Sequence, residues 1–125
     1  MDATVNLRAG WYGFLAGAVT GALLGLCFHR EDWLGGYGAF PRRMLRLGHI
    51  ACFGLGLINI LFALTAATLP AGPVLRGAST LLLVGLVTMP LNCFLTAWRK
   101  PFRHAFFVPA GATLAGIGCL VALLP

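Results

Sequence analysis

Four apolar stretches, each about as long as a membrane-spanning helix, constrain this chain more than any other feature. They cover roughly residues 11–28, 47–69, 75–98 and 105–124. A helix needs about 20 apolar residues to cross the hydrocarbon core of a bilayer. The stretches lack the alternation of apolar and polar residues that marks a membrane β-barrel strand, and only helices or closed barrels satisfy their backbone in lipid. We therefore predict an all-α integral membrane protein, an antiparallel four-helix transmembrane bundle.

The composition agrees with a membrane protein and leaves no room for a second domain. Of the 125 residues, 59% are hydrophobic and 10% are charged, against the roughly 25% charged residues that are usual in soluble domains. The four stretches take up about two thirds of the chain. We expect residues 1–125 to form a single four-span transmembrane domain.

Positive charge is concentrated at one end of the predicted bundle, which predicts its orientation. The end that receives the carboxyl terminus of the first stretch, here called the arginine-rich end, carries Arg30, Arg42, Arg43, Arg46, Arg99, Lys100 and Arg103, and the opposite end keeps Arg8 and Arg76. Because loops rich in lysine and arginine stay in the cytoplasm, we predict a protein of the cell (inner) membrane with both termini outside. The positive charge indicates attraction to anionic head groups of the lipid bilayer, and not nucleic-acid binding, since the basic residues lie at helix ends.

Glycines at intervals of four residues mark the first stretch as a packing helix. They are Gly13, Gly17, Gly21 and Gly25. Without a Cβ along one stripe, another helix can approach closely and gain dispersion contacts, the main attraction available between helices in lipid. This pattern predicts close packing against a neighbour in the same chain or against a second subunit.

Small and polar residues also share one face of the second and of the fourth stretch. The second stretch places Gly56 and Asn59 on the face that begins with His49, and the fourth places Gly111 and Gly118 on the face that begins with His104. We predict that these four small or polar residues pack against other helices.

All three histidines, His29, His49 and His104, fall at the arginine-rich end. If the small-residue faces met in a bundle, the imidazoles would point inward at similar depth, with Asn92 one to two turns deeper. We name six candidate cofactor-binding residues: His49, His104, His29, Asn92, Arg46 and Arg103.

Three cofactor chemistries could use such residues. His49 and His104 could ligate the iron of haem b while arginines pair with its propionates, or a histidine and an asparagine could donate to a quinone. Soft and imidazole ligands could instead hold Cu(I), the set then being His49, Cys52, Met89 and Cys93. The alternative is structural: the histidines bond to loop carbonyls and anchor helix ends, and the asparagines join helices.

Catalytic chemistry finds little support in the sequence. Ser79 is the only serine and lies far from every histidine, and no pair of carboxylates is available for acid–base work. No Asp, Glu, Lys or Arg occupies the interior of a stretch, which argues against a proton-coupled pump. We predict no catalytic residue and an accessory or assembly subunit that packs through glycine stripes against other membrane subunits or itself; the alternative is a redox protein binding haem b or quinone near its cytoplasmic face.

Overall fold

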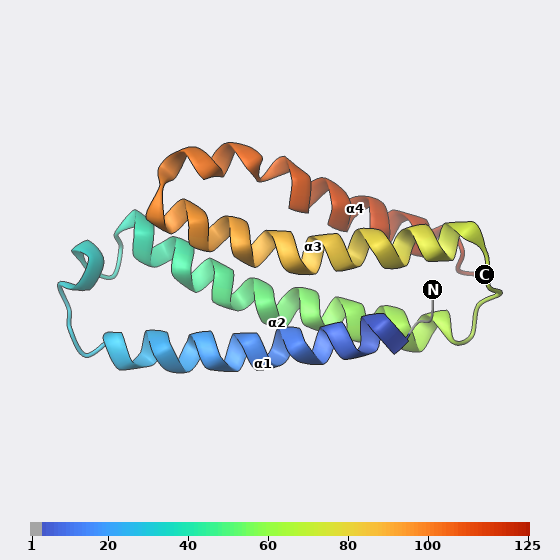
Figure 1. Ribbon diagram of the computed structural model, residues 1–125, viewed down its shortest axis with the longest axis horizontal. Coiled ribbons are helices and arrows are strands. Elements are labelled where there is room, and N and C mark those ends of the chain that lie inside the picture. The colour runs from blue at the N-terminus through green and yellow to red at the C-terminus, as the bar shows by residue number, and fades with distance from the viewer. Residues whose placement is uncertain (1–3) are drawn as a thin grey trace.

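The computed structural model describes residues 4–125, and its regular elements in that range are all helical. Long helices and two short 3-10 helices follow one another along the chain (Figure 1). Their bounds are α1 Thr4–Cys27, η1 Trp33–Gly35, α2 Phe40–Ala66, α3 Pro73–Trp98, η2 Lys100–Ala105 and α4 Phe107–Val121. The prediction of four helices long and apolar enough to span a membrane is confirmed, with the fourth span counted over Lys100–Val121.

The helix bounds differ from the apolar stretches at several points. α1 begins at Thr4, before the apolar run that starts at Trp11, because polar residues of its first turns are accommodated by contacts with other helices. α2 begins at Phe40 with Pro41 in its first turn, where a proline removes no helical hydrogen bond. α3 continues through Pro90 without interruption.

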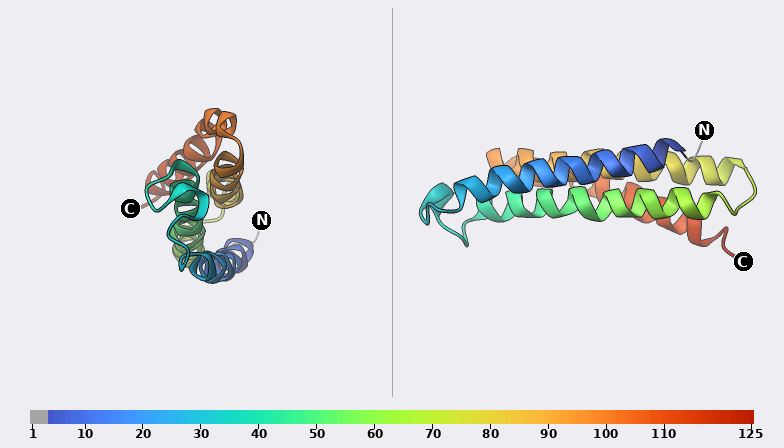
Figure 2. Two further views of the ribbon diagram at one scale, coloured as in Figure 1. Left: turned by 90° about the vertical axis from the view of Figure 1, so that its left-hand side faces the viewer. Right: turned by 90° about the horizontal axis from the view of Figure 1, so that it is seen from below.

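Each long helix packs mainly against its neighbours in the chain. Positions that come later in α1 lie against positions that come earlier in α2, from Gly10 beside Ile60 to Gly21 beside His49. Seen end-on, the helices follow one another from α1 on one side to α4 on the other (Figure 2). Of the most apolar part of each span, 39% of the residues are buried in α2 and also in α3. Only 17% are buried in α1 and also in the fourth span. α2 and α3 therefore form the centre, and α1 and α4 flank it.

The main hydrophobic core lies near the connection between α2 and α3. Phe62 and Ala66 of α2 pack there with Ala78 and Leu82 of α3, and each is at most 7% exposed. Both ends of the described chain lie at this end of the molecule (Figure 1). We call it the termini end, opposite the arginine-rich end.

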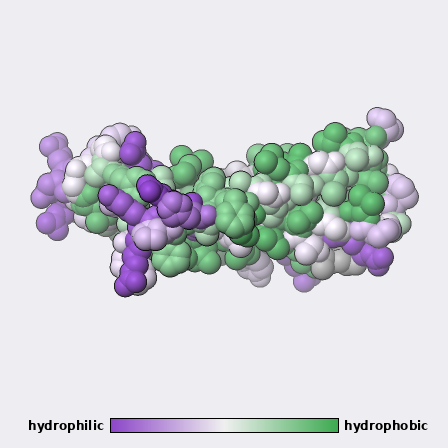
Figure 3. Space-filling model, turned by 90° about the horizontal axis from the view of Figure 1, so that it is seen from above, coloured by the Kyte–Doolittle hydropathy of each residue, from purple (hydrophilic) through white to green (hydrophobic). Residues whose placement is uncertain are grey.

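Most of the outer surface between the two ends is apolar. The face in Figure 3 shows green side chains along the middle of the molecule and purple ones gathered toward its ends. Large apolar side chains such as Tyr12, Leu26, Val87, Phe107 and Leu114 are more than half exposed. An exposed apolar surface of this extent is unusual for a soluble monomer and fits contact with lipid.

Candidate functional site

A buried polar network joins three helices toward the termini end. Asn6 of α1 donates through Nδ2 to Oδ1 of Asn59 at 2.8 Å and to the carbonyl oxygen of Ser79 at 3.3 Å. The hydroxyl of Ser79 donates to Oδ1 of Asn6 at 2.5 Å. Asn59 in turn donates to the carbonyl oxygens of Leu55 at 2.9 Å and Leu82 at 3.2 Å. The network therefore links α1, α2 and α3 through side chains that are at most 3% exposed.

The spacing of small and polar residues in α2 predicts Asn59 as a packing residue, but it does not point to Asn6 and Ser79 as its partners in the network. Asn6 lies 53 residues from Asn59, and Ser79 lies 73 residues from Asn6, so no local pattern connects them. One signal was present: Asn6, Gly10, Gly13 and Gly17 follow one another at steps of four, three and four, which extends the glycine face of α1 to Asn6. This network holds helices together and has the character of a structural element.

The distance between α1 and α2 widens from the termini end to the arginine-rich end. A Cβ built on Gly10 would lie 2.6 Å from the backbone oxygen of Gly56, and one on Gly13 would lie 3.1 Å from the backbone oxygen of Cys52. Farther along, the atoms nearest to a Cβ on Gly17 would belong to the ring of Phe53, the first of them at 2.7 Å. The two backbones are therefore in contact at one end and separated by side chains toward the other.

Three of the glycines predicted to pack have no neighbour. A Cβ on Gly25, Gly111 or Gly118 would meet nothing within 4 Å in the described part of the chain. α4 instead buries Pro109, Ala112 and Gly116, next to the predicted face. A role of Gly111 and Gly118 in packing against another chain stays a prediction.

His49 lies between α1 and α2 with one ring nitrogen engaged. Its Nδ1 is 2.9 Å from the carbonyl oxygen of Gly17 and 3.4 Å from Oγ1 of Thr20, and its ring packs edge-on against Phe53 at a centroid distance of 5.3 Å. Since a carbonyl oxygen only accepts, Nδ1 carries the hydrogen and donates it. The imidazole is thereby held against α1, where Gly21 leaves room for it.

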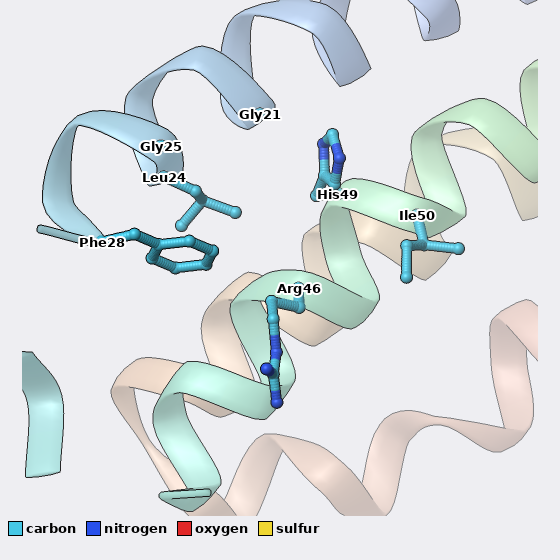
Figure 4. A pocket seen from close by; sticks show the side chains of 7 residues that line it. All are labelled: Gly21, Leu24, Gly25, Phe28, Arg46, His49 and Ile50. Atoms are coloured by element: carbon cyan, nitrogen blue, oxygen red, sulfur yellow. The ribbon is translucent and has the colours of Figure 1, made fainter. Parts of the chain in front are cut away.

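A pocket of about 280 Å³ opens beside His49, between the last turns of α1 and the early turns of α2. Figure 4 shows Leu24 and Phe28 reaching into the gap from α1, and His49 rising from α2 toward Gly21. Its lining consists of Gly21, Leu24, Gly25, Phe28, Arg46, His49 and Ile50. It brings together two of the six candidate cofactor residues, His49 and Arg46.

Arg46, which the sequence reasoning assigned to cofactor binding, also contacts the loop between α1 and α2. Its guanidinium lies 3.9 Å from the ring centroid of Tyr37, and its Nη2 donates to the carbonyl oxygen of the same residue at 3.2 Å. This bond uses one of the five N–H donors of the side chain. The guanidinium can therefore bind a further acceptor while it holds the loop.

Arg42 fixes the same loop from a buried position. The side chain is 3% exposed and lies over the rings of Phe28 at 4.7 Å and Trp33 at 5.6 Å, within the range of cation–π attraction. Its Nη1 donates to the carbonyl oxygen of Glu31 at 3.0 Å, and its Nε has no hydrogen-bond partner among residues 4–125. Part of the positive charge at this end thus serves the packing of the loop.

The other candidate cofactor residues lie outside the pocket. His29 follows α1 and bonds through Nδ1 to the carbonyl oxygen of Leu26 at 2.6 Å, while His104 belongs to η2, with its Nε2 3.5 Å from Nε of Arg103. Asn92 is buried in α3, and its Nδ2 has no hydrogen-bond partner among the described residues. The bond from His29 to a carbonyl at the end of α1 agrees with the structural alternative, in which histidines anchor helix ends.

The side chains that could ligate a metal ion do not gather in groups of three in the described part of the chain. Within residues 4–125 no three His, Cys, Asp or Glu side chains gather closely enough to hold a metal ion, so His49, Cys52 and Cys93 do not come together as three of the four ligands considered for Cu(I). Haem b binding through His49 and His104 stays a prediction. A Soret band that disappears in both His49→Ala and His104→Ala would support it.

The chain matches no family model, no curated protein and no solved structure, so its function has to be inferred from its own residues.

Proposed function

We propose that this protein is an accessory or assembly subunit of the cell (inner) membrane, in which four antiparallel helices cross the bilayer. The arginine-rich end would face the cytoplasm and both termini the outside, because the basic residues are concentrated there. The long apolar helices and the apolar surface between the two ends support insertion. The polar network supports a scaffold role, since it uses its buried donors to join helices.

The observation that carries the assembly role is the unpaired stripe of small residues on α4. Gly111, Ala115 and Gly118 are exposed, and a Cβ on either glycine would meet nothing within 4 Å among residues 4–125. α4 packs against α3 with its other face, through Gly116 and Thr113. In lipid, helices associate where small residues let their backbones approach. The α4 stripe is therefore proposed to receive a helix of a partner subunit or of a second copy.

A pair of leucine substitutions on the stripe tests this role. The variant with both Gly111→Leu and Gly118→Leu would be compared with Gly77→Leu, which places one leucine at an exposed and open glycine of α3. Light scattering of protein extracted in mild detergent, with mass spectrometry of co-purified subunits, gives the composition of each assembly. We expect the double variant to lose the partner that the unaltered chain and Gly77→Leu retain. A monomeric unaltered chain, or equal assembly of all three proteins, would refute the proposal.

The orientation is tested independently by reporters fused to the carboxyl terminus. We expect activity from a reporter that works only outside the cytoplasm and none from one that requires the cytoplasm. The reverse result would overturn the orientation and leave the assembly role open to its own test.

A further inference from the structure

We propose that the pocket between α1 and α2 binds one anionic phospholipid, with the phosphate at Arg46 and an acyl chain along Gly25. The proposal deepens the membrane role stated above and rests on insertion of the helices into lipid. It does not depend on the α4 stripe or on a partner subunit.

The shape of the pocket suits one slender apolar chain. Gly25 contributes no side chain, and a Cβ there would meet nothing within 4 Å, so the surface of α1 is open at this point. Leu24, Phe28 and Ile50 supply apolar walls. The volume of about 280 Å³ lies just below the roughly 300–1,000 Å³ that is typical of small-molecule sites. One acyl chain matches this narrow space better than a rigid macrocycle does.

The depth of the lining residues matches the layers of a phospholipid. Phe28 and Arg46 lie nearest the arginine-rich end, while Gly21 and His49 lie about two turns and one turn deeper, respectively. Figure 4 shows the side chain of Arg46 extending toward the start of α2, as a cation does when it reaches from the hydrocarbon to the head groups. The acyl chain would thus lie deeper in the membrane than the positively charged side chain of Arg46.

The charge at the mouth selects an anionic head group. Arg46 has N–H donors left beside its bond to Tyr37, and Arg43, three residues earlier on the same helix, is exposed. Guanidinium groups bind phosphate oxygens through paired, charge-assisted hydrogen bonds. Among residues 4–125 no carboxylate lines the pocket, and the chain carries 9 Lys and Arg against 3 Asp and Glu. Basic pockets between membrane helices at the cytoplasmic side are suited to anionic lipids for this reason.

Filling the groove tests the position of the acyl chain. The full chain, its Gly25→Leu variant and Gly54→Leu would be compared; Gly54 is an exposed glycine of α2 that is also open and does not line the pocket. Native mass spectrometry in a non-ionic detergent, with added phosphatidylglycerol or phosphatidylcholine, counts the retained lipids. We expect one phosphatidylglycerol on the unaltered chain and on Gly54→Leu, and about tenfold weaker retention on Gly25→Leu. Equal retention by all three proteins would overturn the proposal.

Removing the charge tests the selectivity. We expect Arg46→Gln to lower the preference for phosphatidylglycerol over phosphatidylcholine roughly fivefold, and Arg76→Gln, at the opposite end, to leave it unchanged. Equal binding of the two lipids by the unaltered chain would refute an anionic site. If the organic extract of the purified protein contained stoichiometric quinone, and Gly25→Leu lost it, the molecule bound in the pocket would be a quinone and not a lipid.

The lipid site and the assembly role can fail separately. Gly25→Leu should keep the assembly that the α4 stripe forms, and the double α4 variant should keep its lipid. Loss of lipid from the double α4 variant together with its partner would show that the lipid belongs to the interface with the partner, and would overturn a site between α1 and α2.

Discussion

Among residues 4–125, buried polar groups are hydrogen-bonded toward the termini end of the molecule, and several are unpaired at the arginine-rich end. Toward the termini end, Asn6, Asn59 and Ser79 bond to one another and to backbone oxygens across three helices. At the arginine-rich end, three buried atoms have no hydrogen-bond partner among the described residues: Nε of Arg42, Nδ2 of Asn92 and Oγ1 of Thr96. An unpaired polar atom is costly in a hydrocarbon environment and far less so near head groups and water. Buried polar groups therefore fix the helix arrangement toward the termini end, whereas those at the arginine-rich end are only partly paired.

The packing of α1 on α2 follows the same contrast. Backbones meet at Gly10 and Gly56, whereas toward Gly25 the two helices separate enough to leave a pocket (Figure 1). Close packing and an open site are thus divided between the two ends of one helix pair.

The largest effect is expected from Gly10→Leu. A Cβ at this position would lie 2.6 Å from the carbonyl oxygen of Gly56, and a backbone cannot move aside as a flexible side chain can. Overpacking here should lower the free energy of unfolding by about 3 kcal/mol, measured by far-UV circular dichroism during titration with dodecyl sulfate. Gly25→Leu, on the same helix at the open end, should change the free energy of unfolding by no more than about 0.5 kcal/mol. Equal effects would mean that α1 and α2 do not diverge.

Asn59→Leu should be the next most destabilising change. It removes the acceptor of Asn6 and leaves part of a buried amide unpaired, which costs about 1–3 kcal/mol. The same titration measures the loss. Asn6→Leu should add little in the Asn59→Leu background, because both side chains belong to one network. Additive losses would show that the two asparagines act independently.

Arg42→Gln should release the loop between α1 and α2 with a smaller effect on overall stability. Arg42 makes cation–π contacts with Phe28 and Trp33, and such contacts range from about 0.5 kcal/mol at exposed sites to about 2 kcal/mol when they are desolvated. We expect faster tryptic cleavage after Arg30 and altered fluorescence of Trp33. Arg43→Gln, which alters an exposed arginine, is the control. Unchanged cleavage in Arg42→Gln would mean that other contacts hold the loop.

The smallest effect is expected from Asn92→Leu. Its Nδ2 has no hydrogen-bond partner within the described chain, so an apolar side chain of similar size should change the free energy of unfolding by less than about 1 kcal/mol. The comparison with Asn59→Leu measures the difference between the two ends with one substitution. A loss as large as that of Asn59→Leu would show that Asn92 is paired in the membrane.

Local features of the sequence predicted the helices well and the site in part. The length of each apolar stretch is enough to predict a span, although polar residues hid the first turns of α1. Two of the six candidate cofactor residues, His49 and Arg46, line the pocket, and cofactor binding by them stays a prediction. His29, His104, Asn92 and Arg103 were expected in the same site, but the structure places none of them in its lining.

Four long apolar helices and a concentration of positive charge at one end could be predicted from the sequence, because both depend on composition within a single segment. Only the tertiary structure decided that Asn6, Asn59 and Ser79 meet, that α4 packs beside its predicted face, and that Gly25 borders a pocket. Residue spacing assigns a side chain to one face of a helix. Which neighbour that face meets, and how closely, depends on how the helices diverge along their length.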